Sequence, residues 1–175
     1  GWRSEIAPEA SLYNRICDHE WRRPAGPITA CGGDMMVRAE AFRQAGGFNP
    51  AVIAAEDDDF CLRLAGAGWA LERLPLEMTR HDAAITRFGQ WWRRAVRAGH
   101  GFAQVGALHP GHFRTERRRV LAYGLILPLI ALIGAAHGPV VPVLMAALYA
   151  LSWQRSARGL QAEGMAPGEA RAQAV

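Results

Sequence analysis

The spacing of apolar and polar residues over the first half of the chain predicts short helices separated by strands and turns. The stretch 8–21 has apolar side chains four residues apart and a proline in its first turn, which favours a helix. A short strand is expected over 28–31, because two glycines follow it. Residues 39–45 suit a brief helix that two further glycines end, with Phe48 entering the core.

Four consecutive acids open the next expected helix, in the run Ala55-Glu56-Asp57-Asp58-Asp59-Phe60. Phe60 and Leu64 lie four positions apart and give this helix one buried face. Acids in a first helical turn face the positive end of the helix dipole, so simple capping is one interpretation. Capping needs only one or two acids, and four repel one another. The other interpretation is therefore a cation, a substrate hydroxyl or an arginine close to the run.

Strand-like pieces at 69–74 and 76–80 follow, and they place His81 at the end of a strand. A long amphipathic helix is expected over 84–105. One side of this helix is apolar and the other is basic and polar. The apolar side holds Ile85, Phe88, Trp92, Val96 and Gly99, and the polar side holds Gln90, Arg93, Arg94 and Arg97. Solvation alone would explain the basic side, and the two tryptophans, Trp91 and Trp92, are equally suited to a lipid interface.

Two apolar runs without charge, 120–136 and 140–153, change the character of the chain after a basic cluster in 106–119. Both are short for a bilayer and both contain a proline, so buried helices of a soluble domain are one interpretation. Arginine flanks the pair only on the outside, however, which favours a membrane hairpin with both ends in the cytoplasm. The remainder, 154–175, is expected to be a flexible cytoplasmic tail.

Composition excludes some functions. The chain has 175 residues with 20 basic and 16 acidic side chains, a formal net charge of +4, and all its basic side chains are arginine. No RNA- or DNA-binding motif accompanies this modest charge, so nucleic acid is not an expected partner. Cys17, Cys31 and Cys61 are odd in number and form no Cys-x-x-Cys pair, which argues against a disulfide framework or a zinc site.

Five short motifs occur in a fixed order between about residues 28 and 97: Gly32-Gly33-Asp34, Gly46-Gly47-Phe48, Glu56-Asp57-Asp58-Asp59, His81 and Gln90-Trp91-Trp92-Arg93-Arg94. Each is weak alone. Together they resemble the C-terminal half of a family 2 glycosyltransferase, an inverting enzyme of the GT-A type that uses nucleotide-sugar donors. The resemblance departs from the family at two positions, because Asp34 stands where asparagine is common and Arg94 stands where the Gln-x-x-Arg-Trp signature of processive synthases has tryptophan.

The resemblance implies roles for these residues. Asp57 would be the general base, and Glu56 and Asp59 would orient the base or the acceptor. Donor and acceptor would be bound by the set Gly32, Gly33, Asp34, Asp59, Gln90, Arg93 and Arg94. His81 would be a ligand of a divalent metal, Mn²⁺ or Mg²⁺, at the donor diphosphate.

The fold implied is α/β: the acceptor-side half of a Rossmann-like GT-A domain over 1–105, followed by the basic segment and a membrane hairpin over 120–153. The expected activity is transfer of a sugar, with inversion, to a saccharide or lipid-linked acceptor at the cytoplasmic face of the membrane. The nucleotide-binding half is expected to be missing from this chain. One alternative is a non-catalytic membrane protein in which acids and arginines only pair with each other. A second is a metal-dependent hydrolase built on the acidic run.

Overall fold

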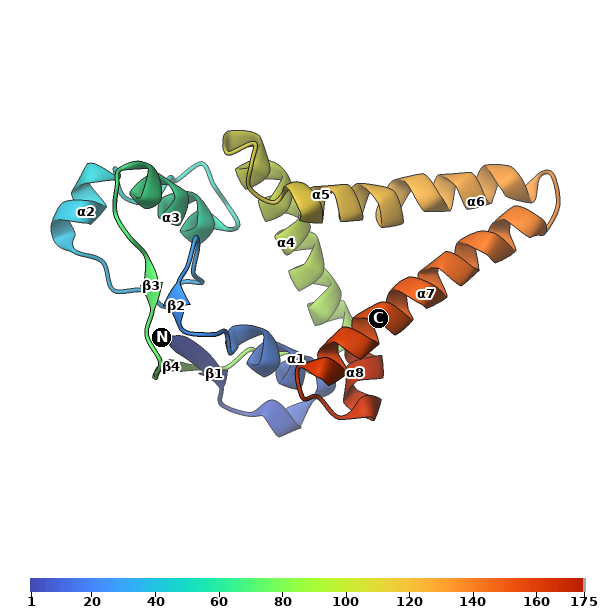
Figure 1. The fold of residues 1–175 in the computed structure, drawn as a ribbon, viewed down its shortest axis with the longest axis horizontal. Coiled ribbons are helices and arrows are strands. Elements are labelled where there is room, and N and C mark those ends of the chain that lie inside the picture. The colour runs from blue at the N-terminus through green and yellow to red at the C-terminus, as the bar shows by residue number, and fades with distance from the viewer. Residues whose placement is uncertain (175) are drawn as a thin grey trace. The chain divides into compact units, whose positions relative to one another are not determined.

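The structure is a computed structural model that describes residues 1–174, and it divides into two compact units, Gly1–Arg117 and Arg118–Val175. Short strands and helices α1 to α4 make up most of the first unit, and long helices make up the second (Figure 1). Each unit is described by itself below.

Two pairs of short strands connect distant parts of the first unit. β1 (Trp2–Glu5) runs parallel to β4 (Glu77–His81), with Arg3 opposite Thr79. β2 (Gly26–Pro27) runs antiparallel to β3 (Glu72–Arg73). Parallel pairing requires a long connection between partners, and here that connection contains α1, α2 and α3.

The strand expected over 28–31 is not formed, and the short strand β2 lies just before it. The Ile28 backbone N–H still donates to Leu71 O at 3.0 Å, but the chain then leaves the ladder. It turns towards α3, where the Cys31 and Cys61 sulfur atoms lie 3.5 Å apart. The glycines after Cys31 are therefore carried to the acidic helix rather than to a sheet edge.

The helix expected over 8–21 is divided at Ser11. The 3₁₀ turn η1 (Pro8–Ala10) precedes it and α1 (Leu12–Trp21) follows it. The Ser11 hydroxyl accepts a hydrogen bond from the Asn14 N–H at 3.0 Å, which caps α1, and it donates to Ile85 O at 2.5 Å. Ser11 thereby ties the start of α1 to the segment before α4.

The core of this unit forms where α2 (Ala39–Gln44) meets α3 (Glu56–Gly66). Ala41, Phe60 and Leu64 are its buried residues. Phe48, expected in the core, is 47% exposed. Its ring contacts those of Phe42 and Phe60 with centroids 5.9 Å and 4.8 Å away, so it covers the edge of the core instead of filling it.

The long helix α4 (Phe88–Leu108) begins later than expected, because the Gln90 side chain accepts the Thr86 and Arg87 N–H groups and caps the helix there. Ile85 is buried in the preceding loop and is not part of the helical face. The apolar side chains Phe88, Trp92 and Val96 are exposed along the N-terminal half of α4. Nothing in the described residues covers this stripe.

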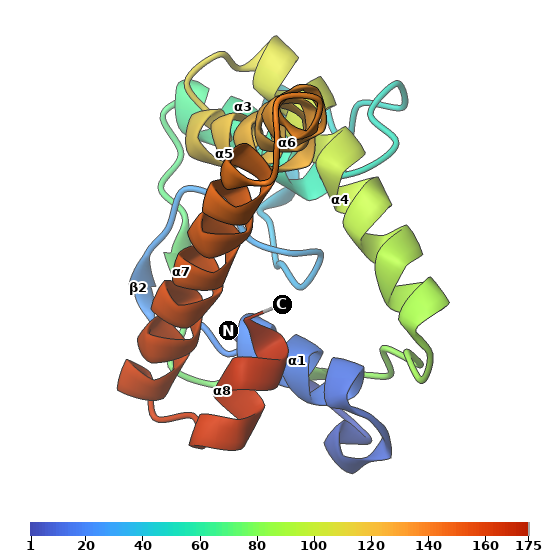
Figure 2. The ribbon, with the colours of Figure 1, turned by 90° about the vertical axis from the view of Figure 1, so that its right-hand side faces the viewer.

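The second unit is a hairpin of two long helices with a short third helix. α5 (Arg114–Leu121), the π-helical turn η2 (Ala122–Ile126) and α6 (Leu127–Ala135) run into one another, and α7 (Val140–Ala162) returns beside α6. α6 needs a glycine at 134, close to the turn, because a Cβ there would lie 2.4 Å from the Val141 side chain. Figure 2 shows α8 (Pro167–Gln173) beside the end of α7.

The segment 154–175, expected to be a flexible tail, is largely helical in its described part, with a break at 163–166 between two helices. Residues 154–162 continue α7, and α8 packs against that end of the helix. Ala157 and Ala170 are buried, and the Trp153 indole N–H donates to Arg171 O at 2.9 Å. Small side chains such as these allow the two helices to approach closely. The polar residues around them in the sequence hide this packing from a reading of composition. Val175 lies outside the described residues.

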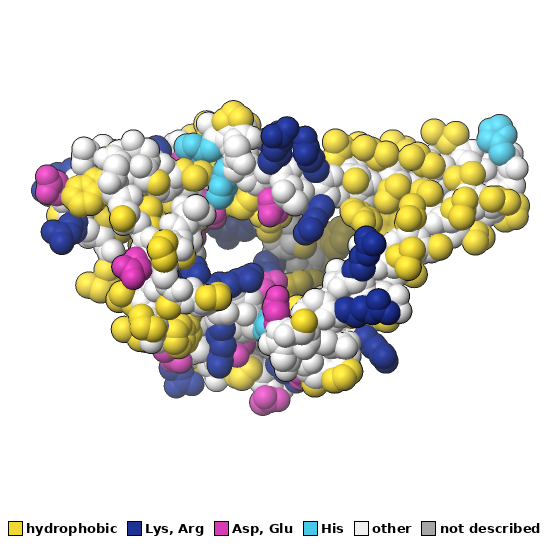
Figure 3. Space-filling model, in the orientation of Figure 1, with side chains coloured by type: hydrophobic (Ala, Val, Ile, Leu, Met, Phe, Trp, Pro, Cys, Tyr) yellow, Lys and Arg dark blue, Asp and Glu magenta, His cyan; other side chains and the backbone are white. Residues whose placement is uncertain are grey.

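One helix in the described part of the chain, Arg114–Ala135 with 22 residues, is long and apolar enough to cross a membrane by length and composition. The second helix of the expected hairpin, α7, is free of charged residues over 140–153 and then contains Arg155 and Arg158. On the face shown in Figure 3, hydrophobic side chains are spread over the part of both helices near their connection. Leu132, Ile133 and Val140 are among the exposed ones.

Candidate active site

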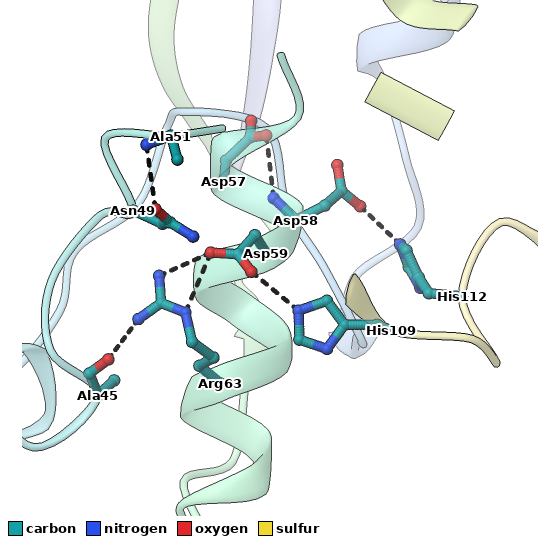
Figure 4. Close-up of polar contacts among 9 residues, drawn as sticks. All are labelled: Ala45, Asn49, Ala51, Asp57, Asp58, Asp59, Arg63, His109 and His112. Carbon is teal, nitrogen blue, oxygen red and sulfur yellow. Dashed lines mark hydrogen bonds and ion pairs between the residues drawn. The ribbon is translucent and has the colours of Figure 1, made fainter. Parts of the chain in front are cut away.

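Three consecutive aspartates lie in the first turn of α3, and the fold gives each a different environment. The helix begins after Ala55, which has a left-handed backbone (φ 59°) and supplies no side-chain cap. Helical geometry turns successive residues by about 100°, so Asp57, Asp58 and Asp59 point in different directions. Figure 4 shows their carboxylates separated around the start of the helix.

Asp59 is a buried structural anion. Its side chain accepts hydrogen bonds from Arg63 at 2.8 Å and from His109 at 2.8 Å, and Arg63 also reaches Ala45 O. Burial acts to raise the pKa of Asp59, but the hydrogen bonds from His109 and Arg63 outweigh it and leave the pKa lowered. An aspartate held in this way is charged and fully engaged. Its position therefore suits Asp59 to orienting α3 better than to binding substrate, the role expected for it.

Asp58 is paired with a second histidine. The His112 Nε2 lies 3.0 Å from Asp58 Oδ1, and both side chains are largely buried. Burial raises the pKa of Asp58, and the hydrogen bond from His112 partly offsets the rise. The family resemblance implies no separate role for Asp58.

Asp57 has no side-chain partner among the described residues. Its Oδ1 accepts only the backbone N–H of Asp58, at 3.0 Å. Burial, followed by the charge of Asp58, raises the pKa of Asp57 above its usual range. A half-buried carboxylate with a raised pKa and an unoccupied oxygen has the properties of a general base.

The glycine loop passes close to Asp57. A Cβ added at Gly32 would lie 3.9 Å from Asp57 Oδ2 and 3.8 Å from an Arg3 nitrogen. The Arg3 guanidinium pairs with Asp34 and lies over the Trp21 ring at 5.1 Å. The loop is thus held beside the carboxylate, and its lack of side chains leaves the approach open.

Asp34 is engaged by the protein itself. Besides the ion pair with Arg3, it accepts a hydrogen bond from the Thr79 hydroxyl at 2.5 Å, so it joins the loop to β1 and β4. A cavity of about 390 Å³ borders this loop; its lining includes Arg3, Cys31, Gly32, Asp34, Asp58 and Arg73. Asp58 is the member of the acidic run that lines this cavity. Asp57, the residue before it, lies next to Gly32, which also lines the cavity.

Residues of the Gln-x-x-Arg segment divide between structural and exposed positions. Gln90 is used to cap α4, where its Oε1 accepts the N–H groups of Thr86 and Arg87. Arg94 pairs with Glu20 at 2.6 Å and lies over the Trp91 ring at 5.0 Å. Arg93 is exposed. The structure therefore does not gather Gln90, Arg93 and Arg94 around Asp57.

His81 lies at the end of β4 and packs edge-on against Trp21, with ring centroids 5.4 Å apart. Within residues 1–174 no three side chains of His, Cys, Asp or Glu gather to hold a metal ion. The residues described thus do not fit a metal by themselves. A metal at His81 would need ligands from outside them.

Sequence reasoning missed His109 and His112, which approach the acidic run from the loop between α4 and α5. They are three residues apart in His109-Pro110-Gly111-His112-Phe113, directly after a long helix. That spacing was visible in the sequence. Its partners were not, because 50 and 54 residues separate the histidines from Asp59 and Asp58.

Comparison with known proteins identifies the class. Residues 14–157 match the model of glycosyl transferase family group 2, so the chain belongs to this glycosyltransferase family. The family resemblance expected from the motifs is thereby confirmed.

Among curated proteins, the chain is similar to the pre-mycofactocin glycosyltransferases of two Mycobacterium tuberculosis strains, CDC 1551 and H37Rv. It is 28% identical to each over 114 residues, which is 65% of this chain. The match covers 24% of each relative, so the chain spans about a quarter of their length. No solved structure matches the chain.

Proposed function

We propose that this chain carries the acceptor side of an inverting glycosyltransferase, with Asp57 as the general base. The observation that carries the proposal is the difference between the three aspartates. Asp58 and Asp59 are each held by a histidine, whereas Asp57 has an unoccupied oxygen and a raised pKa beside the Gly32 loop. Membership of a glycosyltransferase family supports sugar transfer as the reaction.

In the proposed reaction, Asp57 accepts the proton of an acceptor hydroxyl while the hydroxyl oxygen forms a bond to the anomeric carbon of a nucleotide sugar. The bond from that carbon to the nucleoside diphosphate breaks, and the diphosphate leaves with the electron pair. Attack opposite the leaving group inverts the anomeric centre. Burial helps Asp57, because a carboxylate with a pKa closer to the working pH is a stronger base.

Other elements have supporting roles in this proposal. Gly32 and Gly33 let the acceptor or donor sugar approach the carboxylate, since neither presents a side chain. Glu56 lies in the same helical turn as Asp57 and would orient the acceptor. Exposed Arg93 is available to a diphosphate, for which a planar guanidinium is a suitable partner. A Mn²⁺ or Mg²⁺ ion at His81 stays a prediction, because the described residues supply no set of ligands for it.

We further propose that the enzyme acts at the cytoplasmic face of the membrane, on a saccharide or lipid-linked acceptor. Arg114–Ala135 supports it as a helix of suitable length and composition. The exposed stripe of Phe88, Trp92 and Val96 on α4 is suited to lipid, because aromatic and aliphatic side chains on one helix face favour the membrane interface. The nucleotide-binding half would belong to a part of the protein outside this chain.

The test is Asp57→Asn in the intact protein, assayed with a panel of radiolabelled nucleotide sugars in native membranes. Asparagine keeps the shape of the side chain but cannot accept the proton. Turnover should fall at least about a hundredfold while the KM for the donor changes little. The matched control is Glu40→Gln, an exposed carboxylate in the first turn of α2, which should keep parental activity. Activity of Asp57→Asn within a few-fold of the parent would remove Asp57 from this role.

A further inference from the structure

Two histidines of one loop hold two of the three aspartates. The imidazole Nε2 of His112 contacts Asp58 Oδ1 at 3.0 Å, and that of His109 contacts Asp59 Oδ1 at 2.8 Å. Figure 4 shows both rings pointing at the start of α3, with Asp57 apart from them. A neutral imidazole that carries its proton on Nε2 donates a hydrogen bond to the carboxylate, and an imidazolium does the same.

The loop that carries these histidines is itself fixed by the first unit. The His109 N–H donates to Val105 O at 2.8 Å, and the His112 N–H donates to His109 O at 2.9 Å. The His112 ring packs against Phe113 with centroids 4.1 Å apart, and Phe113 packs against Phe102 at 4.7 Å. The imidazoles are therefore held in place before they meet the carboxylates.

A third contact anchors the far side of the same loop. The Arg117 guanidinium donates to Gly106 O at 2.6 Å. Gly106 is buried, and a Cβ there would lie 2.6 Å from the Arg117 side chain. The loop between α4 and α5 therefore closes on itself, and its histidines have little freedom to follow a moving carboxylate.

The pairs His109–Asp59 and His112–Asp58 differ in which hydrogen bonds the aspartate keeps when the histidine is replaced. Asp59 would keep its ion pair with Arg63, at 2.8 Å. Asp58 has no other side-chain partner in the described residues, and its carboxylate is adjacent to Asp57 in the same turn. Without His112, a largely buried carboxylate would have to find another donor, and the first helical turn would have to adjust.

We propose that His112 is a positioning residue of the glycosyl-transfer site, which acts through Asp58 to fix the direction of the Asp57 carboxylate. The inference rests on the proposed function of Asp57. His112 touches neither donor nor acceptor in this scheme. Its hydrogen bond holds Asp58 away from Asp57 and leaves the oxygen of Asp57 beside Gly32 free for the acceptor hydroxyl. A displacement of about 1 Å in a reacting group can cost about a hundredfold in rate.

The kinetic test compares three variants at position 112 and its surroundings in the intact protein. His112→Phe keeps a ring against Phe113 but removes the donor, and kcat should fall about tenfold to a hundredfold with donor KM changed less than about threefold. His112→Gln should recover most of that loss, because its amide N–H can take the place of Nε2–H. The fall in kcat should be several-fold smaller for His109→Phe than for His112→Phe, because Arg63 still holds Asp59.

His100→Phe is the control, since His100 is an exposed histidine on α4, and it should behave as the parent. The proposal is overturned if His112→Phe keeps kcat within threefold of the parent. It is also overturned if His112→Gln is as impaired as His112→Phe, because the ring and not the hydrogen bond would then matter.

Carbodiimide labelling separates this proposal from the proposed function. The purified protein is treated with a water-soluble carbodiimide and glycine ethyl ester, and labelled aspartates are located by peptide mass spectrometry. In the parent, Asp57 should be labelled at least several-fold faster than Asp58, and Asp58 should become labelled in His112→Phe but not in His112→Gln.

Equal labelling of Asp57 and Asp58 in the parent would overturn the His112 assignment without requiring any variant to fold. Absence of sugar transfer from the parent, with the labelling pattern intact, would instead overturn the proposed function alone.

Discussion

Three chemically identical carboxylates in one helical turn acquire three different properties from their neighbours. Asp59 is buried against Arg63 and His109, so its pKa is lowered and it stays charged. Asp58 is held by His112, and Asp57 has no side-chain partner within residues 1–174. Mutual repulsion among four adjacent acids is thus relieved by pairing two of them, which leaves a third available for chemistry.

The charge of Asp58 should be visible in the pH dependence of sugar transfer. Asp57 must be ionised to act as a base, so the rate falls as the pH falls through its raised pKa. Asp58→Asn removes the like charge but leaves the burial, so the pKa of Asp57 falls while staying above its usual range. The acidic limb of the pH–kcat profile should therefore move to lower pH.

The measurement is kcat for the parent and Asp58→Asn across the acidic range, in the intact protein. Plateau activity should stay within about tenfold of the parent, because asparagine still accepts the hydrogen bond from His112. If Asp58→Asn loses as much activity as Asp57→Asn, then Asp58, which lines the cavity beside Gly32, is the base.

At the scale of elements, α4 holds the segment that leads into the acidic helix. The Gln104 side chain accepts the Ile53 N–H at 3.2 Å and donates to Ala51 O at 2.6 Å. Gly101 faces Ala54 and Ala55, and this close approach fixes the residue that begins α3. One helix and its following loop therefore position both the entry to the acidic run and two of its carboxylates.

Gly101→Val should disturb this contact. A Cβ at 101 would lie 3.0 Å from Ala55 Cβ and 3.2 Å from Ala54 O, so the helices must separate. Overpacking of this kind lowers the free energy of unfolding by about 1–3 kcal/mol. The variant should also lose activity, because Ala55 precedes the acidic run.

Gly99→Val is the matched control on the same helix. A Cβ at 99 meets nothing within 4 Å, so this substitution introduces no clash. Thermal unfolding in detergent and kcat should both distinguish the two valine variants. Equal melting temperatures would mean that α4 does not press on Ala55 in solution.

At the scale of the molecule, the chain combines a site-bearing unit with a hairpin of apolar helices. The arginines of the second unit and of the segment just before it lie outside the apolar runs. They are Arg114, Arg117, Arg118 and Arg119 before the runs, and Arg155, Arg158 and Arg171 after them. Positive charge close to a membrane-spanning segment favours the cytoplasmic side. We therefore propose that the hairpin enters the membrane and returns.

Reporter fusions test this topology. Fusions to the intact protein after Arg118 and after Arg158 should both report the cytoplasm, and a fusion after His137 should report the opposite side. Arg114–Ala135 is the described helix that meets the length and composition of a membrane span. A cytoplasmic reading after Arg118 with an external reading after Arg158 would therefore mean a single crossing by that helix.

The sequence by itself determined the elements whose cause is local. Acids before an apolar face predicted α3, glycines predicted the end of α2, and the long 3.6-residue periodicity predicted α4. The order of the motifs also predicted the glycosyltransferase family, which the family match confirmed. Neighbouring residues control these features, so a single chain reveals them.

Only the tertiary structure decided which acid is free. His109 and His112 pair with acids 50 and 54 residues away, and Asp34 is held by Arg3, 31 residues away. The failure of the strand at 28–31 and the packing of α8 likewise depend on partners distant in the sequence. Hydrogen bonds between distant residues leave no periodic signal, because each needs only one polar side chain at one position. The identity of the unpaired carboxylate therefore comes from the fold.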